Sequence, residues 1–140
     1  MLPIFVDTSG WYAFLDKDDA NHESALKFIK ELAQLLITSN YIIDETLTLV
    51  NDRLGHNVAI KIGQKLWNEE IAQLVRVTSS DEQEAWKIFV KYQDKGFSFT
   101  DCTSFVLIER LGIPSAFAFD DYFRQYAKFY CLPPIQDFRL

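Results

Sequence analysis

Two short apolar runs in the sequence each end in an aspartate. The first is IFVD at residues 4–7, and the second is AFAFD at residues 116–120. Short apolar runs of this kind are typical of buried strands in a parallel sheet that helices cover on both faces. The carboxyl ends of such strands meet at one edge of an open α/β sheet. The pattern therefore predicts an α/β fold in which Asp7 and Asp120 lie close together, although they are far apart in the sequence.

Strand-like and helix-like segments alternate along the chain. The expected strands are residues 3–6, 35–38, 71–77 and 115–119. Four helices are expected at residues 11–15, 58–67, 81–92 and 122–127. Three more have a visible cap or end: one is capped by Asn21 and reaches Leu32, one is capped by Ser39-Asn40 and ends at Gly55, and one is capped by Ser98 or Thr100 and ends at Gly112. We expect a turn at residues 7–10 and a C-terminal tail around Pro133-Pro134. The alternation favours a three-layer α/β/α sandwich with a mostly parallel central sheet, formed as one domain over residues 1–140.

The composition agrees with a folded protein of this class. Hydrophobic residues make up 49% of the 140 residues, which is typical of a chain that builds a packed core. No apolar run approaches the ~18 residues of a membrane span, and the N-terminus lacks the pattern of a signal peptide, so we expect a cytoplasmic protein with no membrane contact. Cys102 and Cys131 lack metal-site spacing, and we expect both thiols to be unpaired. The formal charge of −6 disfavours nucleic-acid binding through charge alone, unless divalent ions reverse the local field.

Two further acids, Asp101 and Glu45, lie near the starts of helix-like segments. Asp101 has a simple structural explanation, because it would be the third residue of a capping box that begins at Ser98. Asp7 and Asp120 can likewise be explained as turn or helix-cap residues, and Asp121 competes with Asp120 for any catalytic role.

Periodicity alone leaves the acid on the helix before Gly55 undetermined. Glu45 lies about 160° around the helix from Leu47, on the side away from the core stripe. Asp52 shares that face and Asp44 flanks it, so periodicity does not choose among the three acids. Four clustered carboxylates would repel one another unless a cation lies among them or protons are taken up. Such clusters commonly hold Mg²⁺ or Mn²⁺ against a phosphate.

Four segments, in order, resemble the motifs of the PIN-domain nucleases, and especially of the small VapC-like toxins of bacterial and archaeal toxin–antitoxin pairs. FVDTSGWYAFLD resembles the opening strand and acid, and TSNYIIDETLTLVNDRLG is similar to the second strand and the helix that carries the glutamate. FSFTDCTSFVLIERLGI and AFAFDDYF resemble the closing pair of motifs. The resemblance implies metal-dependent RNA cleavage, with Mg²⁺ or Mn²⁺ held by Asp7, Glu45, Asp101 and Asp120.

The resemblance also implies supporting residues and partners. Thr8 or Ser9 would orient a ligand or its water, and Thr100 or Thr103 would support the site in the same way. A toxin of this type implies an RNA substrate, a cognate antitoxin and, commonly, a homodimer. One departure from the family pattern is that Asp121-Tyr122 stands where a basic residue and a histidine are frequent.

Basic, aromatic and histidine side chains offer weaker signals. Candidate phosphate contacts are Arg53, Lys61 and Lys65, which follow Glu45 in the sequence. Four aromatic residues could stack on bases or meet a partner helix: Trp11, Tyr12, Trp67 and Trp86. Core packing is expected for most of them. His22 and His56 have no partner at metal-ligand spacing, so we expect them to be ordinary surface residues.

Three alternative functions were weighed against a nuclease. A haloacid-dehalogenase-type phosphatase needs a second aspartate two residues after the first, where this chain has Ser9. A receiver domain needs paired acids after its first strand, which VDTS does not supply. The third alternative is a PIN-like fold that acts as a non-catalytic RNA- or protein-binding module. The presence of all four acids argues against it, although acids alone do not prove turnover.

Overall fold

The structure, a computed structural model, describes residues 2–32, 35–126 and 128–133. Its centre is a five-stranded sheet in the order β3-β2-β1-β4-β5, with all neighbouring strands parallel. The strands are β1 (Ile4–Val6), β2 (Leu36–Ser39), β3 (Gln73–Val75), β4 (Ser115–Phe117) and β5 (Tyr130–Leu132). The chain builds outward from β1 first on one side and then on the other. The carboxyl ends of β1 and β4 are therefore neighbours at the point where the strand order reverses, which is where open α/β sheets bind their ligands.

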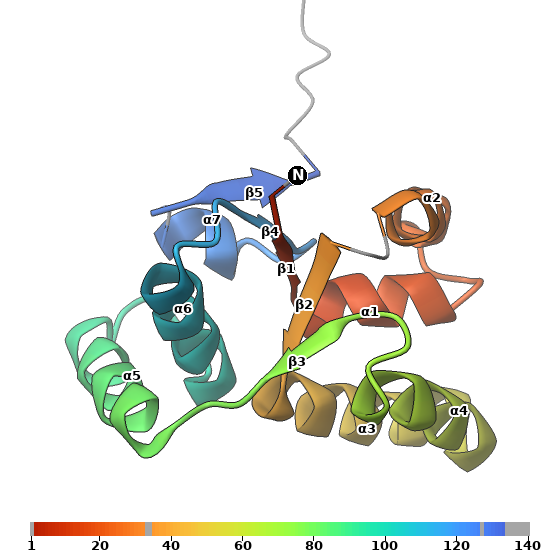
Figure 1. Cartoon of the computed structure of the whole chain (residues 1–140), viewed down its shortest axis with the longest axis horizontal. Coiled ribbons are helices and arrows are strands. Elements are labelled where there is room, and N and C mark those ends of the chain that lie inside the picture. The colour runs from red at the N-terminus through yellow and green to blue at the C-terminus, as the bar shows by residue number, and fades with distance from the viewer. Residues whose placement is uncertain (1, 33–34, 127, 134–140) are drawn as a thin grey trace, which may run out of the picture.

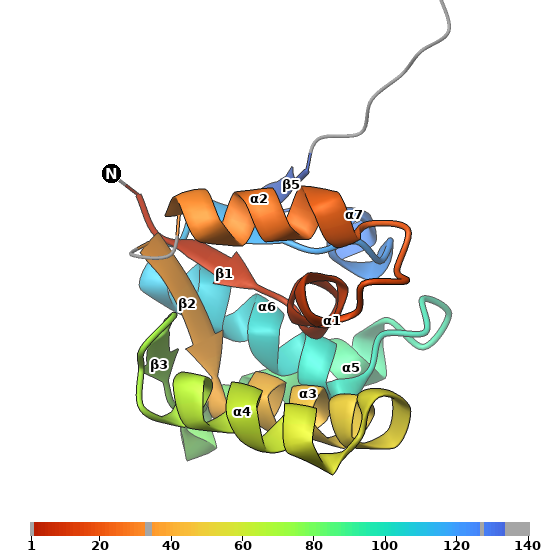
Figure 2. The same cartoon turned by 90° about the vertical axis from the view of Figure 1, so that its right-hand side faces the viewer.

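Seven helices of the described chain cover this sheet. They are α1 (Thr8–Leu15), α2 (His22–Leu32), α3 (Asn40–Leu54), α4 (His56–Trp67), α5 (Ser79–Lys91), α6 (Phe99–Leu111) and α7 (Tyr122–Tyr126). Helices α1 to α4 lie on one side of the sheet and α5 to α7 on the other, as Figure 1 shows. Figure 2 shows α1 end-on, between α2 and the α3–α4 pair. The expected three-layer α/β/α arrangement is confirmed. None of the described helices has the length and apolar character needed to cross a membrane.

The first helix begins earlier than the sequence analysis expected. Residues 8–10 belong to α1, with Asp7 as its N-cap, so the expectation of a turn at residues 7–10 was wrong. Gly10 explains how the helix can start so close to the sheet. A Cβ atom on Gly10 would lie 2.8 Å from Cδ2 of Phe117 and 3.2 Å from the Phe117 carbonyl oxygen, closer than packed atoms allow. Glycine therefore lets the first turn of α1 rest on the end of β4, which brings Asp7 beside the chain that leads to Asp120.

The last strand was missed by the sequence analysis, which expected a tail. Strand β5 pairs in parallel with β4, from Ser115 opposite Tyr130 to Phe117 opposite Leu132. Three residues at a sheet edge are too few to show a period, and the prolines that follow favour a tail interpretation. The expected strand at residues 71–77 is also shorter in the structure, where β3 covers Gln73–Val75. The expected helix at residues 122–127 and the expected tail around residues 133–134 include residues 127 and 134, which lie outside the described residues.

Aromatic side chains divide between the core and the surface. Trp11 and Tyr12 on α1 are buried, in agreement with the expected core packing. Trp67 and Trp86 are 42% and 58% exposed, so core packing holds for two of these four residues and not for most of them. Cys102 and Cys131 are both free thiols, Cys102 buried and Cys131 half-buried.

Candidate active site

Asp7 lies at the carboxyl end of β1 and caps α1 with one of its two oxygens. Its Oδ2 accepts from the backbone N–H of Ser9 (3.1 Å) and from the Ser9 hydroxyl (2.7 Å). Its Oδ1 is buried and has no hydrogen-bond partner among the described residues. A buried carboxylate oxygen without a partner is costly in a folded protein, so this atom indicates a missing ligand.

Asp101 lies on the first turn of α6 and also has a structural role. Ser98 caps the helix, and the two residues form the expected capping box. Oδ2 of Asp101 accepts from the Ser98 backbone N–H, and the Ser98 Oγ accepts from the Asp101 backbone N–H, both at 3.0 Å. No hydrogen bond to the Oδ1 of Asp101 is found within the described chain. The structural explanation for Asp101 is thus correct, and it leaves one oxygen free for another use.

Asp120 follows β4, and one of its carboxylate oxygens also accepts a backbone hydrogen bond. Its Oδ1 accepts from the backbone N–H of Tyr122 at 3.1 Å, which closes a local turn before α7. The neighbouring Asp121 is exposed to solvent. The geometry therefore distinguishes between the two acids, because Asp120 and not Asp121 takes part in the cluster formed with Asp7 and Asp101.

The three acids converge at the carboxyl edge of the sheet. Asp7, Asp101 and Asp120 each offer one carboxylate oxygen, and these oxygens lie within 4.8 Å of one another. Burial, followed by the charges of Asp120 and Asp101, raises the pKa of Asp7 well above its ordinary value, and the Ser9 hydrogen bonds offset this only in part. Burial raises the pKa of Asp101 to about 6, helped by the charges of Asp120 and Glu45 and opposed by the Ser98 hydrogen bonds. The cluster thus has an excess of negative charge that a cation would relieve.

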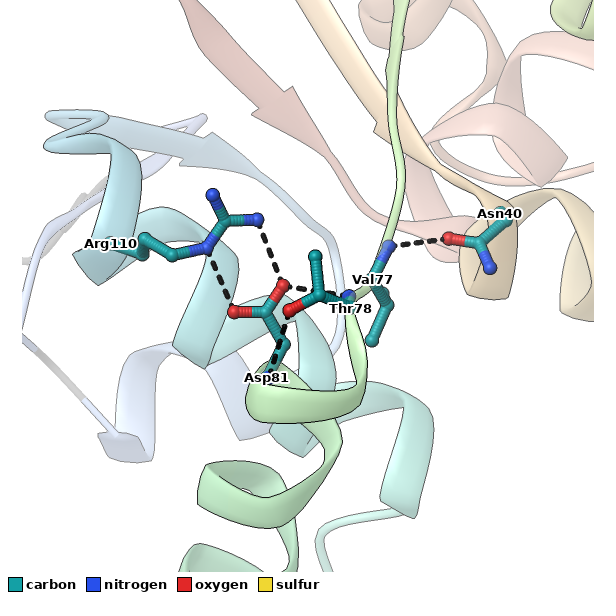
Figure 3. A network of polar contacts seen from close by, with 5 residues as sticks. All are labelled: Asn40, Val77, Thr78, Asp81 and Arg110. Atoms are coloured by element: carbon teal, nitrogen blue, oxygen red, sulfur yellow. Dashed lines mark hydrogen bonds and ion pairs between the residues drawn. The ribbon is translucent and has the colours of Figure 1, made fainter.

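A second capping box elsewhere in the protein shows what a neutralised acid looks like. Asp81 is the third residue of a capping box with Thr78 at the start of α5, the same local position that Asp101 has on α6. Figure 3 shows the guanidinium of Arg110 meeting Asp81 through two hydrogen bonds of 2.8 Å. Burial of Asp81 would raise the pKa of its carboxyl, but the bonds from Arg110 and Thr78 outweigh it and leave the pKa below its ordinary value. Within the described part of the chain Asp101 forms no ion pair with a cation, and its pKa moves in the opposite direction.

Glu45 lies beside the three aspartates but outside their cluster. It projects from α3 and is half-buried, whereas Asp44 and Asp52 on the same helix are exposed. Burial raises the pKa of Glu45, and the charges of Asp120 and Asp44 add to this, while a hydrogen bond from Thr8 opposes it. The influence of Asp120 on Glu45, and of Glu45 on Asp101, places its carboxylate next to the cluster.

The four expected supporting residues have different surroundings. Ser9 bonds to Asp7 directly, while Thr8 offsets part of the rise in the pKa of Glu45 and accepts from the Thr46 hydroxyl at 3.4 Å. Thr103 instead donates to the carbonyl oxygen of Thr100 at 2.7 Å, within its own helix. No hydrogen bond of the Thr100 hydroxyl is found in the described chain. The structure thus brings Thr8 and Ser9 to the acids and turns Thr103 toward its own helix backbone.

The three expected phosphate contacts do not join the acid cluster. Arg53, Lys61 and Lys65 are exposed on α3 and α4. The guanidinium carbon of Arg53 lies 5.5 Å from the ring centre of Tyr12. Arg53 is eight residues beyond Glu45 on the same helix, which corresponds to about 12 Å along its axis.

The histidines make other contacts. Nδ1 of His22 lies 2.8 Å from the carbonyl oxygen of Ala13, and Nδ1 of His56 lies 2.8 Å from Oδ1 of Asn51. Neither histidine belongs to the acid cluster found among the described residues.

Two contacts that the sequence analysis did not foresee hold the corner that carries Asp120. The Ser9 hydroxyl accepts from the backbone N–H of Phe119 at 2.9 Å. Arg124 on α7 donates through Nη1 to the carbonyl oxygens of Ala118 (2.9 Å) and Asp120 (3.3 Å). Neither contact has a signal in the sequence, because each involves a backbone group that carries no residue-specific pattern.

The donor set suits a hard divalent cation. All three converging atoms are carboxylate oxygens, which Mg²⁺ and Mn²⁺ prefer over nitrogen or sulfur. The buried Oδ1 of Asp7 is an unpartnered acceptor, and the raised pKa values of Asp7 and Asp101 indicate that positive charge is missing. These observations fit a metal site at the edge of the sheet.

Comparison with known proteins identifies the family. The model of the PIN domain matches residues 4–129, so the chain belongs to the PIN-domain family. The chain is 36% identical over 117 residues to the 23S rRNA-specific endonuclease VapC20 of Mycobacterium tuberculosis, covering 84% of this chain and 88% of that protein. It is 26% identical over 111 residues to ribonuclease VapC26 of the same species, covering 76% and 78%.

Solved structures agree with this assignment. The crystal structure of VapC20 from Mycobacterium tuberculosis, described as a Sarcin-Ricin loop cleaving toxin, has a TM-score of 0.83 at 34% identity and covers 89% of this chain and 95% of that one. A DNA-bound VapBC from Salmonella typhimurium has a TM-score of 0.69 at 10% identity and covers 94% and 97%, which supports the fold alone.

Proposed function

We propose that this chain is a VapC-type endoribonuclease that hydrolyses RNA phosphodiester bonds with Mg²⁺ or Mn²⁺. The observation that carries the proposal is the set of three aspartates that each offer one carboxylate oxygen within 4.8 Å of the others, with the Oδ1 of Asp7 buried and unpartnered. The names of its relatives support the ribonuclease activity.

The acids have different proposed roles. Asp7, Asp101 and Asp120 would hold the ion, and Glu45 would contribute a fourth carboxylate beside them. Such an ion, when bound, would supply Lewis-acid polarisation of a phosphate and activation of a water. Ser9 and Thr8 keep Asp7 and Glu45 in place, and Thr100 and Thr103 support the first turn of α6.

Because no protein nucleophile is required, removing one carboxylate should abolish the chemistry and preserve the fold. The test is cleavage of an RNA hairpin carrying the sarcin–ricin loop, chosen because of the similarity to VapC20, with Mn²⁺, Mg²⁺ or EDTA. We expect cleavage by the wild type that requires the ion and is absent in Asp7→Asn and Asp101→Asn. Asp52→Asn, an exposed acid on α3, is the matched control and should cleave normally.

Two other outcomes of this experiment would change the assignment. Cleavage that persists in both variants would identify a contaminating nuclease. Mn²⁺ binding by a protein that cleaves neither the hairpin nor total RNA would favour the non-catalytic binding module.

The exposed basic residues give the proposal a substrate surface. We assign Arg53, Lys61 and Lys65 to the phosphates of the RNA at a distance from the cut bond. Replacing each with glutamine should raise the KM for the hairpin and leave kcat unchanged. An unchanged KM in all three variants would contradict this assignment.

We also propose that the protein works in the cytoplasm, as one domain, with a cognate antitoxin that covers the acids and with a second copy of itself.

Three exposed apolar side chains on one face of α5 support the homodimer: Trp86 (58% exposed), Phe89 (39%) and Val90 (46%). They line a cavity of about 440 Å³ together with Phe97. Trp86→Glu should convert a dimer to a monomer in light scattering, and a wild type that is already monomeric would contradict the homodimer.

A further inference from the structure

Arg124 makes an unusual set of contacts around the corner that carries Asp120. Its Nη1 donates to the carbonyl oxygens of Ala118 and Asp120, and its Nη2 donates to the carbonyl oxygen of Pro133 at 2.6 Å. Ala118 and Asp120 belong to the link between β4 and α7, and Pro133 directly follows β5. One side chain therefore joins the segment with the last acid to the end of the edge strand.

The charge of Arg124 is directed at backbone oxygens and not at a carboxylate. Across residues 2–32, 35–126 and 128–133, no acid forms an ion pair with it. Arg110 provides the contrast, because its guanidinium is paired with Asp81 through two bonds. A guanidinium has five N–H donors in a fixed plane, so it can hold several carbonyls at once, whereas a lysine ammonium lacks that fork.

The corner is held from two sides. On the side of α1, the Ser9 hydroxyl accepts from the N–H of Phe119. On the side of α7, Arg124 holds the carbonyls of Ala118 and Asp120. The Oδ1 of Asp120 is also fixed, by the N–H of Tyr122. Movement of Asp120 away from the other two aspartates would break at least one of these contacts.

We propose that Arg124 is a positioning residue that keeps Asp120 at the right distance from Asp7 and Asp101 for ion binding. This inference rests on the proposed metal-dependent function. Arg124 lies four residues beyond Asp120 and acts through the backbone carbonyl oxygens of Ala118 and Asp120.

Arg124→Lys tests the proposal because it keeps the positive charge and loses the planar fork. The first readout is the affinity for Mn²⁺ alone, measured by the electron paramagnetic resonance signal of the free ion. We expect about tenfold weaker binding, the size of effect typical of groups that orient metal ligands. The second readout, in the absence of any ion, is amide hydrogen exchange of Phe119 to Tyr122, which should become faster than in the wild type.

Arg110→Lys is the matched control. Arg110 lies nine residues after Asp101 on α6, about 13 Å along the helix axis, so the same substitution should leave Mn²⁺ affinity within twofold of the wild type. The expected result is a loss of Mn²⁺ affinity in Arg124→Lys alone, with a lower kcat for the hairpin.

Three results would overturn the inference. The first is unchanged Mn²⁺ affinity in Arg124→Lys when the wild type binds the ion. The second is an increase in KM alone, which would make Arg124 a substrate contact. The third is faster exchange spread over the whole protein, which would show a general loss of stability. A wild type that binds no Mn²⁺ would instead refute the proposed function, and the exchange data would still show whether Arg124 holds the corner.

Discussion

The hydroxyl of Ser9 accepts a hydrogen bond from the backbone N–H of Phe119, which lies 110 residues further along the chain. The same hydroxyl donates to Oδ2 of Asp7. Ser9 thus joins the first acid of the cluster to the residue before the last acid. A hydroxyl has one donor and two acceptor sites, so it can make both bonds at once. Two motifs at opposite ends of the chain are held in register by one small side chain.

Replacing Ser9 with alanine should separate these motifs. Ser9→Ala leaves the Phe119 N–H without its partner and removes one of the two hydrogen bonds to Asp7. We expect at least a tenfold loss of cleavage and of Mn²⁺ affinity, with Ser9→Thr restoring most of both. Ser104→Ala is the control, because the Ser104 hydroxyl donates to the Thr100 carbonyl oxygen within α6 and not to the acid cluster of the described residues. Equal activity of Ser9→Ala and the wild type would show that the bridge is not needed.

Replacing Asp7 with asparagine should abolish most of the RNA cleavage and leave the fold intact. Asparagine is as good an N-cap as aspartate, and the change removes a charge from a crowded cluster. We expect cleavage to fall by more than a hundredfold and the urea midpoint of the ion-free protein to stay the same or rise. A large drop in the midpoint would mean that the charge of Asp7 stabilises the fold.

The ion-free protein should lose stability as the pH rises through about 6. The pKa of Asp101 is raised from 3.8 to about 6 in the folded state, so folding favours its protonated form. The stabilisation is fully present below pH 4 and disappears above pH 6, an effect of about 1 to 3 kcal/mol. Urea unfolding in EDTA between pH 4 and pH 8 measures it.

Two additions make the pH experiment specific. Asp101→Asn should make the decline smaller without abolishing it, because Asp7 and Glu45 also have raised pKa values, and saturating Mn²⁺ should restore stability at pH 7.5, by about 2.7 kcal/mol at a hundred times its Kd. A stability that increases steadily with pH in EDTA would contradict the raised pKa.

The Asp81–Arg110 pair should matter for stability and not for cleavage. Asp81 is 2% exposed, and Asp81→Ala removes a helix cap and leaves Arg110 unpaired. We expect a loss of about 1 to 2 kcal/mol in the free energy of unfolding, because the capping box is lost while the Arg110 side chain, 42% exposed, remains in contact with solvent, with the cleavage rate unchanged at 20 °C. Glu84→Ala, which breaks an exposed pair with Lys87, should cost less than about 0.5 kcal/mol. Similar losses in the two variants would contradict the greater weight given to the Asp81–Arg110 pair.

Much of the fold could be predicted because its signals are local. Ser39 and Ser98 cap their helices as the sequence indicated, and Gly112 ends α6 in a left-handed conformation. The start of α1 could not be foreseen, since it depends on a contact between Gly10 and Phe117 across the sheet. Strand β5 exists because it pairs with β4, and three residues carry no pattern of their own.

The acids that form the candidate site could be predicted, but the hydrogen bonds that hold them in place could not. The family motif selected Glu45 over Asp44 and Asp52, a choice that helical periodicity had left open. Ser9 was expected to orient Asp7 or a water, but its bond to Phe119 depends on tertiary structure. Arg124 was missed because its partners are backbone carbonyls, which every residue has and no sequence pattern marks.

The different contacts of the two carboxylate oxygens in Asp7 and Asp120 have an evolutionary consequence. At Asp7 and Asp120 one oxygen secures the backbone and the other is free for chemistry, and asparagine can do the first task without the second. A single nucleotide change converts an aspartate codon into an asparagine codon. On the proposed function, one nucleotide change would therefore remove the activity and still leave a folded protein with the same surface.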